Sequence, residues 1–469
     1  MLVADPSTDP TRMNRVYACW RRLNLDINGN FEPEYGGEAY FKYSDDGGQT
    51  FNPPQGDQLS YDDSWATLTA YVDAAVARDG RLYAIWYNDA YFYGDPPNIL
   101  RPEGFEYRVI SNAGTTFNPP LDQVPSYINF EALGFTFASV NGLTSAFTHF
   151  NIIKDQPSIA VDWSEEREGW VYVAFASERY WEGQPGGDNG GESDVYVVRS
   201  QDGGQNWDPP VKVNDDPQVW EPPPNNLPYD VHQFMPCLRT DTGGRVGVSW
   251  YDTRDHVEFG WNSTNYHIYF AYSIDGAATF EENFRVTCNQ SDPFDPRGPG
   301  ERVDIGDYSG MGAYGRWFVP VFTSLERYNP ANPDHNRWSN LAGDIFTATV
   351  EVKQGPPDFD FDCDVDGEDF GTFQLCFGGS GVPPAPGCRK ADLDGDNDVD
   401  LADFLILQNA YTGSHNQCAE AQGPTCGGEG ESGPQAAPEG PGPVPGDPEP
   451  EEWYWMLYEY CRANNIPFS

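Results

Sequence analysis

Hydrophobic residues alternate with small or polar ones in short segments that recur through residues 10–353, and turn-forming Gly, Pro, Asp and Asn separate these segments. This period of two is typical of β-strands joined by tight turns. Adjacent segments predict hairpins at residues 68–77 with 81–87, 156–162 with 169–175, 234–240 with 245–251, and 305–313 with 316–323. Further strands are predicted at residues 16–20, 39–43, 107–110, 194–199, 267–272 and 344–350. We therefore expect a mainly β fold.

One motif follows four of these predicted strands. Three copies fit the form S-x-D-G-x-x-x-[FW], at residues 44–51, 200–207 and 273–280, and a degraded copy with Asn112 in place of Asp occupies residues 110–117. The Asp carboxylate can accept backbone N–H groups within such a turn, Gly supplies a positive φ, and the final aromatic ring can pack against the sheet. The motif predicts the same structured turn in each repeat.

The repeating unit is a sheet of four strands, and the sequence contains five such units. A sheet of this size buries both faces only by stacking on other copies around an axis, which predicts a β-propeller over residues 1–353. The first unit is expected to be incomplete and to lack its innermost strand, because the first predicted strand begins at Val16. Residues 121–150 are either an aromatic-rich insertion or a poorly marked extra blade.

The motif resembles the Asp-boxes (bacterial neuraminidase repeats) of the sialidase superfamily, and the resemblance covers roughly residues 10–353. It implies a sialidase-like propeller of the type that usually has six blades, with the boxes on the rim away from the active site. Sialidases hold the substrate carboxylate with three arginines and use a Tyr–Glu nucleophile pair and an Asp acid/base. The first arginine lies in an Arg-Ile-Pro type motif near the N-terminus, which this sequence lacks. The missing motif argues against sialidase activity, and the boxes, because of their place on the rim, indicate a fold and not a catalyst.

Some residues are still candidates for a central pocket. Tyr251, Asp252 and Arg254 follow one another at the end of a predicted strand, and Asp307 precedes the last hairpin. Arg254 could bind a carboxylate through two hydrogen bonds, and Asp252 or Asp307 could act as a general acid. The alternative is that Asp252 and Arg254 form a structural ion pair between blades and that Asp307 caps a turn.

Four tryptophans lie in segments rich in Gly, Pro and Asn, at Trp181, Trp220, Trp261 and Trp338. Aromatic faces on loops can stack against sugar rings, which would suit carbohydrate binding. The alternative is that these rings pack the long loops onto the protein.

Two segments downstream of the propeller share a spacing of carboxylates. Residues 358–369 and 392–403 are 12-residue loops with Asp at positions 1, 3, 5, 7, 9 and 12. The predicted ligands are Asp358, Asp360, Asp362, Asp364, Asp366, Asp369, Asp392, Asp394, Asp396, Asp398, Asp400 and Asp403. Position 7 is expected to offer its backbone carbonyl. This spacing matches EF-hand loops, which gather hard oxygen donors around Ca²⁺, and it predicts two calcium sites.

A single predicted helix follows each loop, at residues 370–377 and 404–411, so the pair resembles the type I dockerin module more than a full EF-hand pair. The resemblance implies a small α domain over residues 356–415 and a cohesin-like protein as its partner. Dockerins use positions 10 and 11 in that contact, and these are Gly367-Glu368 and Leu401-Ala402 here, which differ from the usual pair of small hydroxyl residues. The module could instead serve stability or attachment alone.

The formal net charge is −46, from 73 acidic and 27 basic residues. Such a surface repels nucleic acid and anionic membranes, so neither is an expected partner. The sequence contains neither an apolar run long enough to span a membrane nor a signal-peptide pattern at its start. We nonetheless expect a secreted or cell-surface protein, because extracellular calcium fills weak sites and the cysteines favour disulfides.

The nine cysteines include two closely spaced pairs, Cys376 with Cys388 and Cys418 with Cys426, which predict local disulfides. Residues 416–450 are rich in Gly, Pro and Glu and predict a disordered linker. Residues 451–469 begin with a strongly aromatic segment that could dock onto a partner or fold back on its own chain.

Three functions are compatible with these features. The first is a calcium-binding protein whose propeller binds glycans or cell-surface material and whose module tethers it. The second is an exo-acting glycoside hydrolase of sialidase type. The third is a structural protein of the cell envelope.

Overall fold

The computed structural model describes residues 2–5, 12–23, 37–60, 68–89, 104–111, 116–121, 123, 125–137, 156–164, 167–178, 193–216, 231–255, 266–287, 291, 305, 309–315, 317–324, 344–352, 357, 359, 365–385, 388, 391–393, 398–411 and 456–457. The chain divides into two compact units. The first comprises Met1–Trp163, Arg167–Ala313 and Val319–Thr349, and the second comprises Val350–Ser469 with Ser164–Glu166 and Tyr314–Phe318.

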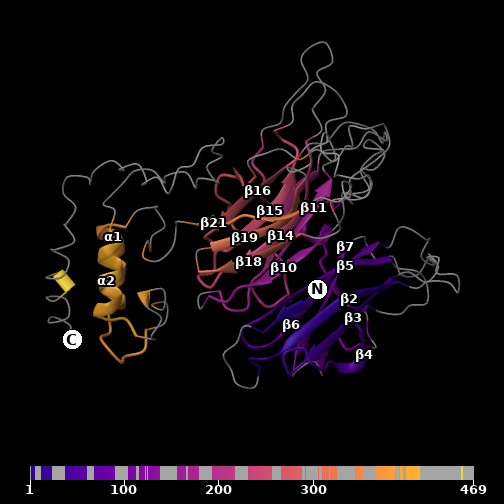
Figure 1. Cartoon of the computed structure of the whole chain (residues 1–469), viewed down its shortest axis with the longest axis horizontal. Helices are drawn as coiled ribbons and strands as arrows, with labels where there is room; N and C mark the ends of the chain where they lie inside the picture. Colours follow the sequence, from indigo (N-terminus) through magenta and orange to yellow (C-terminus); the bar gives the residue numbers. More distant parts are fainter. Residues whose placement is uncertain are drawn as a thin grey trace, which may run out of the picture. The chain divides into compact units, whose positions relative to one another are not determined.

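Five blades of antiparallel strands follow one another along the chain and form a β-propeller (Figure 1). A single parallel pair, Gly37 with Leu68, joins blades 1 and 2 into one nine-stranded sheet. Blade 1 contains β1 (Leu2–Ala4), β2 (Val16–Leu23), β3 (Gly37–Ser44) and β4 (Asn52–Gln58). Blade 2 contains β5 (Leu68–Val76), β6 (Leu82–Asp89), β7 (Gly104–Ser111), and β8 (Thr116–Asn118) and β9 (Ser126–Tyr127), which both pair with β7. Blade 3 contains β10 (Ser158–Val161), β11 (Val171–Glu178), β12 (Ser193–Ser200) and β13 (Val211–Lys212).

Blade 4 contains β14 (Gln233–Thr240), β15 (Val246–Asp252), β16 (His267–Ser273) and β17 (Phe284–Arg285). Blade 5 contains β18 (Gly310–Tyr314), β19 (Trp317–Ser324), and β20 (Asp344–Thr347) and β21 (Val350–Glu351), which both pair with β19. The strands predicted from the alternating pattern are thus confirmed with two exceptions. Strand β18 begins at Gly310 and not at residue 305, and the strand predicted at residues 344–350 is two separate strands, β20 and β21. A short helical turn, η3 (Glu131–Leu133), follows β9.

Two expectations about the blades are corrected. Blade 1 has an innermost strand, because β1 pairs antiparallel with β2 from Leu2 opposite Ala18 to Ala4 opposite Val16. This strand has only three residues, too few for the alternating pattern to reveal it. The described residues form five blades, and the sixth blade implied by the family resemblance is not among them.

Neighbouring blades bury each other's faces. Alternate residues of β6 point to opposite sides, with Leu82 and Trp86 in the core between blades 1 and 2, and Tyr83 and Tyr87 in the core between blades 2 and 3. Strand β11 repeats the arrangement, since its alternate residues enter the core with blade 2 and the core with blade 4. Because both faces are covered, these strands are hydrophobic on both sides, as expected for a stacked sheet.

The three S-x-D-G copies form the same turn. In blade 3, Asp202 accepts hydrogen bonds at Oδ1 from the backbone N–H groups of Gln205 (3.0 Å) and Asn206 (2.8 Å), and Ser200 Oγ accepts one from Gly204 (2.8 Å). Asp46 and Asp275 make equivalent contacts in blades 1 and 4. The final aromatic packs on the preceding blade and not only on its own sheet, since the ring of Trp207 lies 5.7 Å from that of Tyr107.

Among its described residues, the second unit contains the helices α1 (Gly367–Cys376) and α2 (Leu401–Asn409), which share one small core. Phe370 and Phe373 of α1 pack against Phe404 of α2, with ring centroids 6.2 and 6.1 Å apart. Among the described residues of the whole chain, no helix is long and apolar enough to cross a membrane.

Candidate functional site

The predicted pocket residues Asp252 and Arg254 lie at the end of β15 and contact each other directly. Arg254 donates to the Asp252 carboxylate twice, from its backbone N–H to Oδ1 at 2.8 Å and from Nε to Oδ2 at 2.9 Å. The indole N–H of Trp250 also donates to Oδ2, at 2.7 Å. Asp252 is fully buried. Its carboxylate is therefore held by donors from its own strand end, and by the side-chain amide of Gln233 in β14, which donates to Oδ1 at 3.4 Å.

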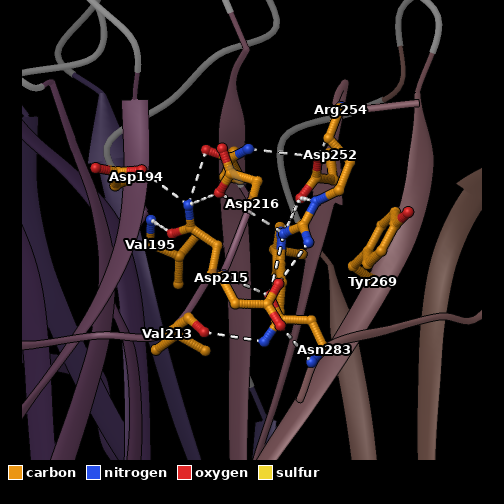
Figure 2. Close-up of polar contacts among 12 residues, drawn as sticks. Asp194, Val195, Val213, Asp215, Asp216, Asp252, Arg254, Tyr269 and Asn283 are labelled. Carbon is orange, nitrogen blue, oxygen red and sulfur yellow. Dashed lines mark hydrogen bonds and ion pairs between the residues drawn. The ribbon is translucent and has the colours of Figure 1, made fainter. Parts of the chain in front are cut away.

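The rest of the Arg254 guanidinium reaches blade 3. Nη1 donates to Asp215 Oδ1 at 2.7 Å, Nη2 donates to Asn283 Oδ1 at 3.1 Å, and the guanidinium carbon lies 4.3 Å from the ring centroid of Tyr269 (Figure 2). Asp215 follows β13 of blade 3, whereas Asn283 precedes β17 of blade 4. Only 13% of the Arg254 side chain is exposed. The guanidinium thus joins two blades, and its donors already have partners in the protein.

Asn283 strengthens this junction from the other side. Its backbone N–H donates to Asp215 Oδ2 at 2.9 Å, its side-chain amide donates to the carbonyl of Val213 at 3.0 Å, and its Oδ1 accepts the backbone N–H of Asp215 at 2.8 Å. Figure 2 shows these residues converging beside Arg254. Asp215 and Asn283 lie 68 positions apart, so no local pattern in the sequence indicates that Asn283 joins this cluster.

Burial sets the electrostatics of this cluster. Desolvation raises the pKa of Asp252, and the nearby charge and hydrogen bonds of Arg254 oppose that rise. Burial is the largest single effect on the pKa of Arg254 and lowers it, but the combined charges and hydrogen bonds of Asp252, Asp215 and Asp216 outweigh burial and raise this pKa above its usual value. The arginine therefore remains a cation that compensates a buried carboxylate.

Tyr251 is also buried and joins blade 4 to blade 5. Its hydroxyl accepts the backbone N–H of Thr323 at 2.9 Å, and the hydroxyl of Tyr266 donates to the Thr323 carbonyl at 3.0 Å. Burial raises the pKa of Tyr251 to about 12. The fourth pocket candidate, Asp307, lies outside the described residues, as do the four candidate sugar-stacking tryptophans.

Blade 2 contains a related arrangement. Trp86 and Asn88 of β6 occupy the positions of Trp250 and Asp252 in β15, and both donate at 3.0 Å to the buried carboxylate of Glu106. The shared order Trp-Tyr-Asn or Trp-Tyr-Asp at the end of the second strand is the sequence signal for this arrangement. Its repetition indicates that a buried carboxylate under a Trp indole is part of blade construction.

The two predicted calcium loops end in the same way. Asp366 and Asp400, at position 9, cap the N-termini of α1 and α2 by accepting the backbone N–H groups of Glu368 (2.8 Å) and Ala402 (2.7 Å).

The carboxylates at position 12, Asp369 and Asp403, are buried and close the loops. Each Oδ2 accepts the N–H of the capping residue, at 2.9 Å from Asp366 and 2.8 Å from Asp400. Each Oδ1 accepts the N–H of position 2, which is Phe359 in the first loop and Leu393 in the second. Two sequences with the same spacing thus adopt the same local geometry.

The second loop brings possible metal ligands together. Asp398, Asp400 and Asp403 each have a carboxylate oxygen within 4.8 Å of the others. An all-oxygen donor set with two buried members fits a hard cation such as Ca²⁺ and does not suit zinc, which prefers nitrogen and sulfur. The carboxylate of Asp398 belongs to this group, whereas we expected position 7 to contribute its backbone carbonyl.

Of the remaining predicted ligands, Asp392 is described and partly buried. Six lie outside the described residues, namely Asp358, Asp360, Asp362, Asp364, Asp394 and Asp396. Of the predicted ligands in the first loop, the structure therefore describes those at positions 9 and 12, Asp366 and Asp369.

The predicted disulfide between Cys376 and Cys388 is confirmed, and it joins the end of α1 to the loop that follows. The predicted pair Cys418 and Cys426 lies outside the described residues. The C-terminal segment reaches the same core, because Leu457 is fully buried in it and the side-chain amide of Gln374 donates to the Met456 carbonyl at 3.2 Å. At these two residues the segment folds back on its own chain.

Comparisons with known proteins give structural likeness only. No protein-family model matches the sequence, and a comparison with curated proteins also finds no match. Among solved structures, a protein of unknown function from Dyadobacter fermentans has 11% identity to this chain and a TM-score of 0.42, over 74% of this chain and 82% of that one. A polysaccharide lyase of family PL25, an ulvan lyase, has 11% identity and a TM-score of 0.34, over 73% and 69%.

The Hadza microbial sialidase Hz136 has 11% identity and a TM-score of 0.31, over 63% of this chain and 52% of the sialidase. This chain thus spans about half of that enzyme. Sialidases and a lyase are among the structures similar to the propeller, and at these identities they assign neither a substrate nor a catalytic residue to it.

Proposed function

We propose that this protein binds two calcium ions through the loops of its α1–α2 module, and that the module tethers a sialidase-like propeller that binds glycans or cell-surface material. The equivalence of the two loops carries the proposal. Asp369 and Asp403 close their loops with the same two hydrogen bonds, and the second loop gathers three carboxylates within 4.8 Å. Calcium would supply the positive charge that offsets the mutual repulsion of these carboxylates.

Export fits the same proposal. The Cys376–Cys388 disulfide is stable in an oxidising compartment, and calcium sites of this kind fill where calcium is abundant. A cohesin-like protein is the partner that the module's resemblance implies.

The contacts of Arg254 argue against its use as a substrate-binding arginine of sialidase type. An arginine that holds a substrate carboxylate must offer donors to the ligand. The donors of Arg254 are directed at Asp252, Asp215 and Asn283, and its flat face lies on Tyr269. Glycan binding remains our proposal for the propeller, with exo-acting glycoside hydrolysis and a purely structural role as its alternatives.

Calorimetric titration of the full chain with calcium tests the proposal. We expect two binding events in the wild type, and loss of one in Asp403→Asn. The exposed propeller carboxylate Asp79 provides a matched control, since Asp79→Asn should keep both. If adding calcium to millimolar concentration gives no titration heat with the folded protein prepared without calcium, calcium binding is refuted.

The propeller is tested separately. A glycan array probed with the calcium-loaded protein should show selective binding, whereas hydrolysis of a fluorogenic sialoside should be absent. Turnover that disappears in folded Arg254→Ala would establish a sialidase-type enzyme instead.

A further inference from the structure

The loop closed by the Cys376–Cys388 disulfide lies against the second calcium loop. Gly381 donates its backbone N–H to Asp398 Oδ2 at 2.5 Å. Gly378 and Gly379 both donate to the carbonyl of Val399, at 3.0 Å each. Asp398 and Val399 are positions 7 and 8 of the second calcium loop. Three backbone donors from one short segment therefore fix two consecutive residues of the loop.

The loss of backbone entropy opposes this conformation of the segment. Gly379 and Gly381 have φ values of +85° and +75°, in the region that favours glycine, and glycine loses the most backbone freedom on ordering. The disulfide restricts that freedom by linking Cys388 to Cys376, the last residue of α1. Cys376 is buried in the core of the module, so the disulfide ties the segment to a fixed point.

Among the described residues, the backbone donors of this segment reach the second loop. The N–H of Gly381 orients a carboxylate that lies with those of Asp400 and Asp403 in the group of potential ligands. A hydrogen bond to a carboxylate fixes its direction and reduces the freedom that a metal would otherwise have to remove. The donors Gly378, Gly379 and Gly381 all bond to residues 398 and 399 of the second loop.

We propose that the loop closed by the Cys376–Cys388 disulfide positions Asp398 for calcium, so that the second calcium site depends on this disulfide and the first does not. The inference rests on the proposed calcium binding. Its chemistry is a two-electron reduction. A dithiol reductant gives two electrons and two protons to the S–S bond, which yields the thiols of Cys376 and Cys388, while the reductant closes to a cyclic disulfide.

Two variants of the full chain isolate the sites. Asp358→Ala removes position 1 of the first loop and leaves the second to be measured. Asp392→Ala does the converse. Calcium affinity of each is measured by calorimetry before and after reduction with dithiothreitol. We expect reduction to weaken calcium binding about tenfold or more in Asp358→Ala and to leave it unchanged in Asp392→Ala.

A third protein assigns the effect to this disulfide. Cys376→Ser combined with Cys388→Ser, in the Asp358→Ala background, should bind calcium as weakly as the reduced protein and should not respond to dithiothreitol. If this variant does not fold, reoxidation of the reduced protein should restore the original affinity.

The outcomes are separable. Equal affinity of the second site before and after reduction would overturn the inference while leaving calcium binding intact. An equal loss at both sites would also overturn it, because the effect would then be general unfolding of the module. Lack of calcium binding by the oxidised variants would overturn the proposed function together with the inference.

Discussion

Replacement of Arg254 by alanine should destabilise the propeller strongly and leave the calcium module unaffected. The change removes the cation that compensates Asp252, a fully buried carboxylate, and it also removes the donors to Asp215 and Asn283. Breaking a buried pair by removing one partner costs about 3–5 kcal/mol of unfolding free energy. For a unit of about 340 residues this lowers the propeller's midpoint by roughly 4–7 °C.

Differential scanning calorimetry of the calcium-loaded protein measures this shift. The matched control is Arg285→Ala in the same blade, because Arg285 is 42% exposed and lies 3.5 Å from Asp255. A surface pair of that kind contributes about 1 kcal/mol or less, so the control should shift the midpoint little.

The pH dependence gives a second check. Without the Arg254 side chain, mainly the hydrogen bonds from Trp250 and from the backbone N–H of residue 254 still oppose desolvation, so the folded pKa of Asp252 rises further above the unfolded value. A carboxyl whose pKa is raised in the folded state takes up its proton more readily when the protein is folded. The loss of unfolding free energy in Arg254→Ala, relative to wild type, should therefore become smaller as the pH falls toward that pKa. If the loss of unfolding free energy in Arg254→Ala does not change with pH, or if Arg285→Ala loses as much, the buried pair does not stabilise the blades.

Three further predictions follow from single residues. Hydrogen bonds from the side chain and then the backbone of Thr50 lower the pKa of Asp46 to about 2. The free energy of unfolding that wild type gains over Asp46→Asn should therefore be fully present above about pH 4 and be lost as the pH falls through 2. Acid unfolding of both proteins measures this difference. Burial lowers the pKa of His232 to about 4 from 6.5, so wild-type stability should fall, by on the order of 3 kcal/mol, as the pH drops from 6.5 to 4; His232→Gln should lack this slope in denaturant titrations. Asp400→Ala removes the cap of α2 and should cost the calcium-free module about 1 kcal/mol, as measured by thermal melting in chelator, whereas the exposed Glu368→Ala should cost less; equal costs would argue against the cap.

Much of the local structure could be predicted because its causes are local. The turn around Asp202 depends on hydrogen bonds that span at most four residues, and its motif was recognisable in three copies. The capped helix starts at Asp366 and Asp400 likewise depend on partners three residues away. The Cys376–Cys388 disulfide joins residues only 12 positions apart.

The amino-acid sequence by itself determined the strands, the repeated turns and the two loops, since periodicity, glycine and carboxylate spacing act within a few residues. Only the tertiary structure decided the role of Arg254, because its partner Asp215 lies 39 positions away and meets it only when blades 3 and 4 stack. Only the tertiary structure also revealed the innermost strand β1 and the burial of Leu457. Both lie in segments too short for a periodic pattern, and their positions depend on the residues that they contact. Contacts between repeats depend on the register and stacking of whole sheets, which no local pattern specifies.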